Sequence, residues 1–138
     1  MRDKNLRRLK RIFYGLVVIF ILLLLSSFTP PLASKNLILG IISLFLIPFY
    51  FVLGITLIYL TLKSEVEGKL RVFLLLTGTS PIVFLIGVIL HNLLGALGMK
   101  ILHIVFFFIA ILVSPILFLT GAIGSIVLFR KKGGRHPA

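Results

Sequence analysis

Residues 70–98 read LRVFLLLTGTSPIVFLIGVILHNLLGALG, and this stretch decides how the chain is interpreted. It is long and apolar enough to cross a bilayer, since about 20 apolar residues span the hydrocarbon core. Its middle holds TGTSP at positions 77–81, and its far end holds His91 and Asn92. Because Pro81 lacks an N–H and crowds the preceding turn, we expect a local break there, which we call the TGTSP notch (residues 77–81).

The composition of the whole chain indicates a membrane protein. Of its 138 residues 59% are hydrophobic, and the mean hydropathy is +1.22, whereas soluble domains are about 45–50% apolar. Apolar runs at about 12–28, 37–62, 70–94 and 101–129 predict four membrane-spanning helices. We therefore expect an all-α integral membrane protein, a four-helix transmembrane bundle that forms a single domain over residues 1–138.

Basic residues are concentrated on one side of these runs. The chain has 15 lysines and arginines against three acidic residues, for a net charge of +12. Six of the basic residues lie in the arm 1–11, three in 63–71 and four in the tail 130–138, which leaves Lys35 and Lys100 for the other side. The positive-inside rule then predicts a multi-pass protein of the plasma membrane with both termini in the cytoplasm.

The same charges bear on the partners of the protein. The basic flanks predict contacts with the lipid bilayer through anionic lipid headgroups. We expect no nucleic-acid partner, because the chain lacks the groove-entering and stacking elements that such proteins use. A larger membrane protein or a second copy of this chain remains a candidate partner.

The first apolar run, residues 12–28, also resembles the hydrophobic region of a secretory signal peptide. Ala33 is a candidate cleavage residue, but Pro31 occupies the position two residues before it, where a small residue is needed. The run is also long for such a region. We therefore expect a retained first helix that ends at Thr29-Pro30-Pro31, and cleavage would not change the orientation of the rest.

The second and fourth apolar runs share a pattern at an offset of 67 residues. Each has a proline, a glycine six residues later and a basic residue nine after that. A two-helix hairpin duplicated in parallel would give this pattern, but chance explains it more simply, because the first and third runs do not align well. The matched pairs are Pro48 with Pro115, Gly54 with Gly121, and Lys63 with Arg130.

The TGTSP notch is the first candidate site. Its hydroxyl groups can bond backbone carbonyls freed by the proline, bond a neighbouring helix, or line a cavity near the bilayer midplane. A kink packed inside the bundle is the simpler interpretation, and a cavity is the alternative. The residues concerned are Thr77, Thr79, Ser80 and Pro81.

Two histidines form the second candidate site. His91 and His103 flank the short loop predicted at 95–100, so they lie on the same side of the membrane. Neutral imidazoles bind metals and haem iron, which makes the pair a candidate cofactor site. Both residues lie near the interface without a good third ligand, so we expect hydrogen bonds to loop carbonyls, with no metal and no cofactor.

Small residues on one face of the fourth helix predict a close helix contact. Gly121 and Ser125 are four residues apart, and Gly124 lies beside them. Such pairs allow two backbones to approach closely in a membrane. The contact is expected within the bundle, with a contact between subunits as the alternative.

The sequence carries no pattern of residues typical of catalysis, so we expect no catalytic residues and no enzyme. It has no cysteine, no paired carboxylates and no Ser/His/Asp arrangement. The leading hypothesis is an accessory or scaffold subunit that packs against a membrane partner. The alternatives are a small oligomeric transporter or channel with the TGTSP notch lining the path, and a haem- or metal-binding module that uses His91 and His103.

The predicted orientation can be tested by cysteine labelling, because the chain has no cysteine of its own. Cysteines placed at Lys35 and Lys100 should react with an impermeant maleimide added outside the cell, whereas one at Gly68 should react only after the membrane is opened. External labelling at Gly68 would contradict the orientation.

Overall fold

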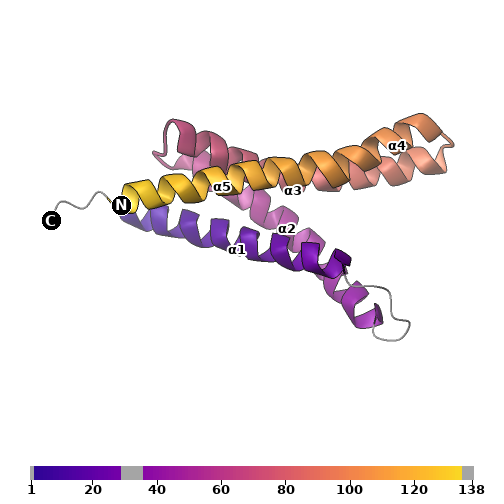
Figure 1. Ribbon diagram of the computed structural model, residues 1–138, viewed down its shortest axis with the longest axis horizontal. Helices are drawn as coiled ribbons and strands as arrows, with labels where there is room; N and C mark the ends of the chain where they lie inside the picture. The colour runs from indigo at the N-terminus through magenta and orange to yellow at the C-terminus, as the bar shows by residue number, and fades with distance from the viewer. Residues whose placement is uncertain (1, 29–35, 135–138) are drawn as a thin grey trace.

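The computed structural model describes residues 2–28 and 36–134, and these residues form helices with no strand among them. The predicted all-helical fold is confirmed, and four stretches are long and apolar enough to cross a membrane. The last stretch, Lys100–Gly133, is one continuous span made of three elements. In chain order the elements are α1 (Arg2–Phe28), α2 (Asn36–Lys63), α3 (Lys69–Ala96), α4 (Lys100–Phe108), the π-helix η1 (Ile109–Val113) and α5 (Ser114–Gly133) (Figure 1).

Two features differ from the expectation. The basic arm is helical from Arg2, so α1 extends well before residue 12, where its apolar run begins. The fourth helix contains the π-helical turn η1 directly before Ser114 and Pro115. Proline has no N–H and its ring crowds the carbonyl four residues earlier, and a wider turn relieves that crowding. The backbone N–H of Ser114 accordingly bonds the carbonyl of Ile109, five residues back.

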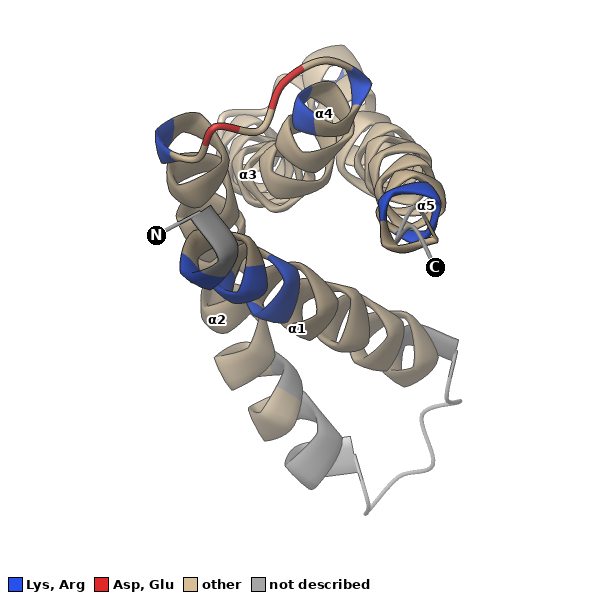
Figure 2. Ribbon diagram, turned by 90° about the vertical axis from the view of Figure 1, so that its left-hand side faces the viewer, with Lys and Arg blue, Asp and Glu red and all other residues tan. Residues whose placement is uncertain are grey.

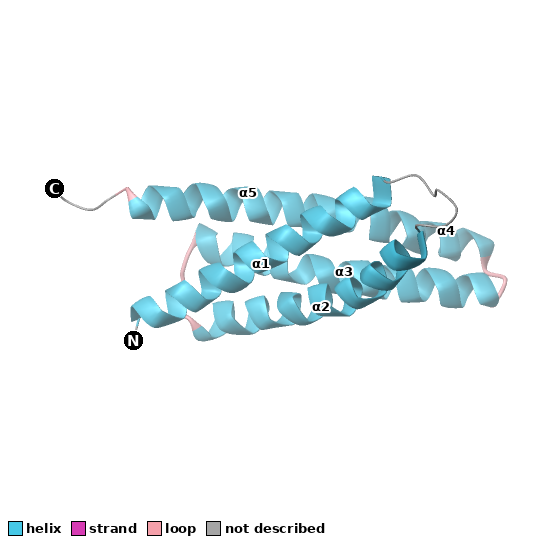
Figure 3. Cartoon of the chain, turned by 90° about the horizontal axis from the view of Figure 1, so that it is seen from below, coloured by secondary structure: helices cyan, strands magenta, loops and turns pink. Residues whose placement is uncertain are grey.

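The two ends of the molecule are chemically different. α1 begins and α5 ends at the same end as the loop 64–68, and the basic residues gather there (Figure 2). We call this the basic end. The turn between α3 and α4 lies at the opposite end, which we call the hairpin end (Figure 3). With four spans across a membrane, the first and last described residues of the chain would thus lie on the same side of that membrane.

A core of large apolar side chains fills the half of the molecule nearer the basic end. Phe13 and Leu16 of α1 are fully buried, as are Leu57 of α2 and Leu74 of α3. α1 meets α5 through two aromatic pairs, which typically add about 0.5–1.5 kcal/mol each beyond their buried area. The Phe13 and Phe129 rings are 5.7 Å apart edge to face, and those of Phe20 and Phe118 stack at 4.0 Å.

Packing is looser toward the hairpin end. α1 and α2 diverge there from the hairpin of α3 and α4 (Figure 1). None of the residues of α4 is buried, and this helix packs on α3 and on its own continuation. The bundle is therefore tightly packed in the half nearer the basic end and open in the half nearer the hairpin end.

The α3–α4 turn is closed by a glycine in a left-handed conformation. Gly98 has a φ of 74°, which side chains other than glycine adopt only with strain. The N–H of Met99 bonds the carbonyl of Leu94, and the N–H of Gly98 bonds the carbonyl of Gly95. These two bonds make a Schellman motif, which satisfies carbonyls that a helix end otherwise leaves free.

Three glycines bring α2 and α5 onto α3. Gly54 of α2 and Gly78 of α3 face each other, because a Cβ on Gly54 would lie 2.8 Å from the Gly78 carbonyl oxygen. A Cβ on Gly121 of α5 would lie 2.6 Å from the Thr77 nitrogen. Gly54 and Gly121, which match at the offset of 67 residues, thus both pack on α3. Without a hydrophobic driving force between helices in lipid, such close contacts supply much of the stability.

We expect Gly121→Ala to lower the free energy of unfolding by about 1–3 kcal/mol, because its methyl group meets backbone atoms that cannot move aside. Gly121→Leu should be worse. Gly15→Ala is the matched control, since the nearest atom to its Cβ would be Leu53 Cδ1 at 4.0 Å. Thermal unfolding in detergent, followed by circular dichroism, measures both; equal midpoints would show that α3 and α5 do not pack here.

Candidate functional site

The TGTSP notch joins α3 to its neighbours near the middle of the span. Thr77 is fully buried and faces Gly121 of α5, where a Cβ would lie 2.5 Å from its Oγ1. Pro81 packs against Gly54 of α2, with its Cγ 2.8 Å from where a Cβ would stand. Two notch hydroxyls bond within α3: Thr77 Oγ1 donates to the Phe73 carbonyl at 2.8 Å and Thr79 Oγ1 to the Leu75 carbonyl at 2.6 Å.

The third hydroxyl of the notch connects α3 to α5. Ser80 Oγ donates to the carbonyl oxygen of Ser114 at 2.8 Å, and Ser114 Oγ donates to the carbonyl oxygen of Ser80 at 3.0 Å. The two hydroxyl oxygens are themselves 3.0 Å apart, and both side chains are buried. We call this reciprocal contact the serine bridge (Ser80 and Ser114). It ties the proline-containing part of α3 to the π-helical turn of the last span.

A cavity of about 470 Å³ lies beside the serine bridge, on the side facing α1 and α2. The stacked rings of Phe20 and Phe118 lie beside it, and it extends toward the half where the two hairpins diverge. We call it the midspan cavity. Its lining is mostly apolar and comes from α1, α2, α3, η1 and α5: Phe20, Leu23, Leu24, Ser26, Ile47, Tyr50, Phe84, Ala110, Ile111, Ser114 and Pro115.

Tyr50 is the polar group that stands out in this lining. Its side chain is only 3% exposed, and its hydroxyl makes no hydrogen bond with any described residue. It lies near Ser80, which donates its own hydroxyl to the Ser114 carbonyl and keeps oxygen lone pairs that can accept from Tyr50. A buried hydroxyl without a partner typically costs about 1–3 kcal/mol. The Tyr50 hydroxyl oxygen is itself buried, so a group in the midspan cavity would reach it only after side chains at the cavity wall shift.

Tyr50 was not among the residues predicted for a site, and the structure adds it. Tyr50 lies near the middle of α2, which runs over Asn36–Lys63, and its ring packs against the stacked pair of Phe20 and Phe118. The signal was present in the sequence, because an interfacial tyrosine should lie near an end of its apolar run. Position 50 is far from both ends.

The two candidate histidines do meet, at the hairpin end. The rings of His91 and His103 stack with centroids 4.1 Å apart. His91 Nδ1 contacts the carbonyl oxygen of His103 at 3.0 Å, and His103 Nδ1 contacts that of His91 at 3.3 Å. Because a carbonyl oxygen only accepts, Nδ1 donates in both contacts. Each imidazole thus joins α3 to α4, and only its Nε2 remains for another partner.

The residues predicted for helix packing lie on the side of α5 that faces α3. Gly121 meets Thr77 as described, and a Cβ on Gly124 would lie 2.5 Å from the Phe73 ring. Ser125 is fully buried, and its hydroxyl has no hydrogen-bond partner among the described residues. This places the small-residue contact inside one bundle rather than between subunits.

The midspan cavity offers mostly apolar surface, with the buried hydroxyl of Tyr50 at its wall. Within residues 2–28 and 36–134, no three histidine or acidic side chains gather as they would around a metal ion. No family model matches the sequence, and no curated protein or solved structure matches it significantly.

The serine bridge and Tyr50 give a matched pair of variants. We expect Ser80→Ala to lower the free energy of unfolding by about 1–2 kcal/mol, because it removes bonds between two helices and leaves Ser114 underpaired. Tyr50→Phe removes one oxygen that has no partner, so stability should stay equal or rise. Thermal midpoints in detergent measure both effects. A Tyr50→Phe variant less stable than Ser80→Ala would reverse these assignments.

Proposed function

We propose that the protein is a non-enzymatic, multi-pass accessory subunit whose midspan cavity receives side chains from a transmembrane helix of a partner protein. One observation carries the proposal: the cavity lies where the two hairpins diverge, and its wall includes Tyr50, whose buried hydroxyl has no hydrogen-bond partner of full geometry among the described residues. An accessory subunit needs an apolar recess with at least one polar group for specificity, and this recess has both.

The depth of Tyr50 favours a protein partner over lipid tails. Near the middle of the span a lipid offers only hydrocarbon, which cannot accept a hydrogen bond. A partner helix can present a serine, threonine or asparagine side chain, or a carbonyl freed by a proline, at this depth. Hydrogen bonds of this kind between membrane helices contribute about 0.6–2 kcal/mol, enough to bias the choice of partner.

A second candidate function follows from the size of the cavity. Its volume of about 470 Å³ falls in the usual range for small-molecule sites, which are mostly apolar with a few polar groups. The candidate ligand is a hydrophobic molecule with one oxygen that bonds Tyr50. The residues that line the midspan cavity do not include the TGTSP notch, so an oligomeric transporter or channel with the notch lining the path is a separate alternative.

The haem or metal hypothesis for His91 and His103 is less well supported. Both Nδ1 atoms contact backbone carbonyls, and the rings stack face to face. A shared ligand would have to be held by the two Nε2 atoms alone.

We further propose that the basic end faces the cytoplasm and that the membrane is the plasma membrane, on the charge asymmetry alone.

Site-specific photocrosslinking in cells tests the accessory role. A photoreactive residue at Ile111, which lines the cavity, should give a discrete adduct with one protein. Leu112 is the matched control, because the two side chains have similar exposure, 48% and 51%, while Leu112 does not line the cavity. Tyr50→Phe should reduce the Ile111 adduct severalfold without changing the amount of protein, since it removes one interhelical hydrogen bond.

The crosslinked peptide, identified by mass spectrometry, should belong to an apolar transmembrane segment. A small-molecule adduct at Ile111 that depends on Tyr50 would instead establish the second candidate. Lipid adducts of equal yield at Ile111 and Leu112, unaffected by Tyr50→Phe, would contradict both.

A further inference from the structure

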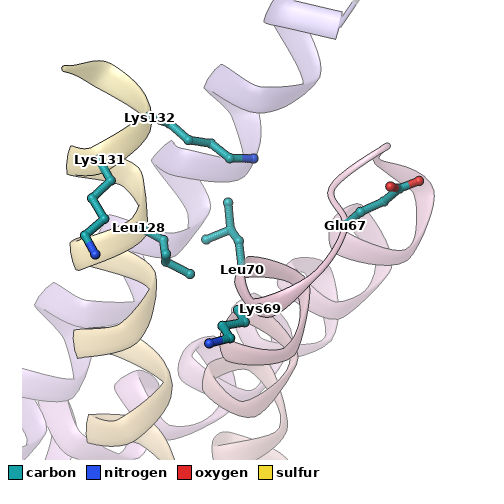
Figure 4. Close-up of a pocket in the computed structure, with 6 residues that line it drawn as sticks. All are labelled: Glu67, Lys69, Leu70, Leu128, Lys131 and Lys132. Atoms are coloured by element: carbon teal, nitrogen blue, oxygen red, sulfur yellow. The ribbon is translucent and has the colours of Figure 1, made fainter. Parts of the chain in front are cut away.

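A second, smaller hollow lies at the basic end, between the start of α3 and the end of α5 (Figure 4). Its volume is about 250 Å³. Leu70 and Leu128 form its apolar part, and Leu70 is anchored in the core at 2% exposure. We call it the lysine pocket, and the residues that line it are Glu67, Lys69, Leu70, Leu128, Lys131 and Lys132.

Its lysines come from two helices, Lys69 from α3 and Lys131 and Lys132 from α5, and lie around Leu70 and Leu128 (Figure 4). Lys69 extends from α3 toward α5, and Lys132 extends from α5 toward Leu70 (Figure 4). Glu67 points away from them, at the far rim. In the described part of the chain, no carboxylate lies within salt-bridge distance of these lysines. The pocket therefore holds unneutralised positive charge.

The start of α3 adds to this charge. Its N-cap residue is Gly68, which has no side chain to accept from the first-turn N–H groups, and no side-chain cap is present. Free N–H groups and the positive end of the helix dipole favour an anion at this position. The lysine side chains and a helix N-terminus thus border the same small hollow.

The position of the pocket determines the kind of anion. Lys69 opens the third candidate span, and Lys131 and Lys132 lie at the end of the fourth, Lys100–Gly133. The ammonium groups would therefore lie at the level of lipid headgroups, and the side chains of Leu70 and Leu128 would lie slightly deeper in the bilayer. A small soluble anion gains no favourable contact from the leucine side chains, whereas the glycerol and first methylenes of a lipid would cover them.

We propose that the lysine pocket binds the phosphate of an anionic phospholipid. The positive charge of its three lysines attracts a headgroup with net negative charge, whereas choline or ethanolamine brings a compensating positive charge, so the pocket discriminates against zwitterionic lipids. This inference is independent of the midspan cavity and its occupant.

Native mass spectrometry of the full chain in a neutral detergent provides the test. The probes are phosphatidylglycerol and phosphatidylcholine, titrated separately, with the dissociation constant of the first bound lipid as the readout. Each lysine near a membrane surface typically contributes about fivefold in affinity for an anionic lipid. Lys69→Gln combined with Lys132→Gln should therefore weaken phosphatidylglycerol binding on the order of 25-fold and leave phosphatidylcholine binding unchanged.

Arg7→Gln combined with Arg8→Gln is the matched control, because it removes the same charge from exposed positions on α1, outside the pocket. It should change binding by no more than about twofold, since distant surface charges are screened. An equal loss in both double variants would show diffuse attraction and overturn the proposal. Full binding in the Lys69→Gln, Lys132→Gln variant would also overturn it.

Soluble phosphates test whether the phosphate that the pocket binds belongs to a lipid or to a soluble compound. Inorganic phosphate and glycerol phosphate, added at millimolar concentration, should leave the bound phosphatidylglycerol in place, because they lack the acyl chains that cover Leu70 and Leu128. Displacement by either one would assign the pocket to a soluble phosphate compound and refute the lipid site.

Discussion

The reciprocal bond between Ser80 and Ser114 is the contact on which the arrangement of the other helices depends. Hydrocarbon offers no partner to a hydroxyl or a carbonyl, so polar groups inside a span must be satisfied within the protein. Each serine precedes a proline, and each donates to the carbonyl oxygen of the other. The bond fixes the rotation of the last span relative to α3 at the depth where both helices depart from regular geometry.

Two further contacts follow from that fixed rotation. Toward the basic end, Gly121 comes against Thr77 and the backbones approach closely. Toward the hairpin end, Gly87 of α3 comes against Ala110, where a Cβ would be 2.9 Å from the Ala110 methyl. The π-helical turn contains Ala110 and absorbs the irregularity that Pro115 introduces. The midspan cavity is then the volume that α1 and α2 leave open beside this rigid pair.

Much of the fold was predictable because hydrophobic run length determines where a chain can span a membrane. Prolines, glycines and basic residues also marked the helix ends closely, as at Lys63 and Lys100. The serine bridge was not predictable, since its residues are 34 apart in sequence and meet only once two helices are rotated correctly. The helical arm was missed because polarity alone does not exclude helix. Tyr50 was not singled out because tyrosine is usually interfacial, although its mid-run position argued otherwise.

The divergence of the two hairpins has a consequence for the surrounding membrane. The two hairpins lie together at the basic end and apart at the hairpin end (Figure 1). With its four spans across a bilayer, a wedge of this form would displace unequal numbers of lipids from the two leaflets. It would be accommodated with least strain where the bilayer already bends, with the leaflet of the α3–α4 turn on the convex side. The shape of the fold would then bias where in a curved membrane the protein accumulates.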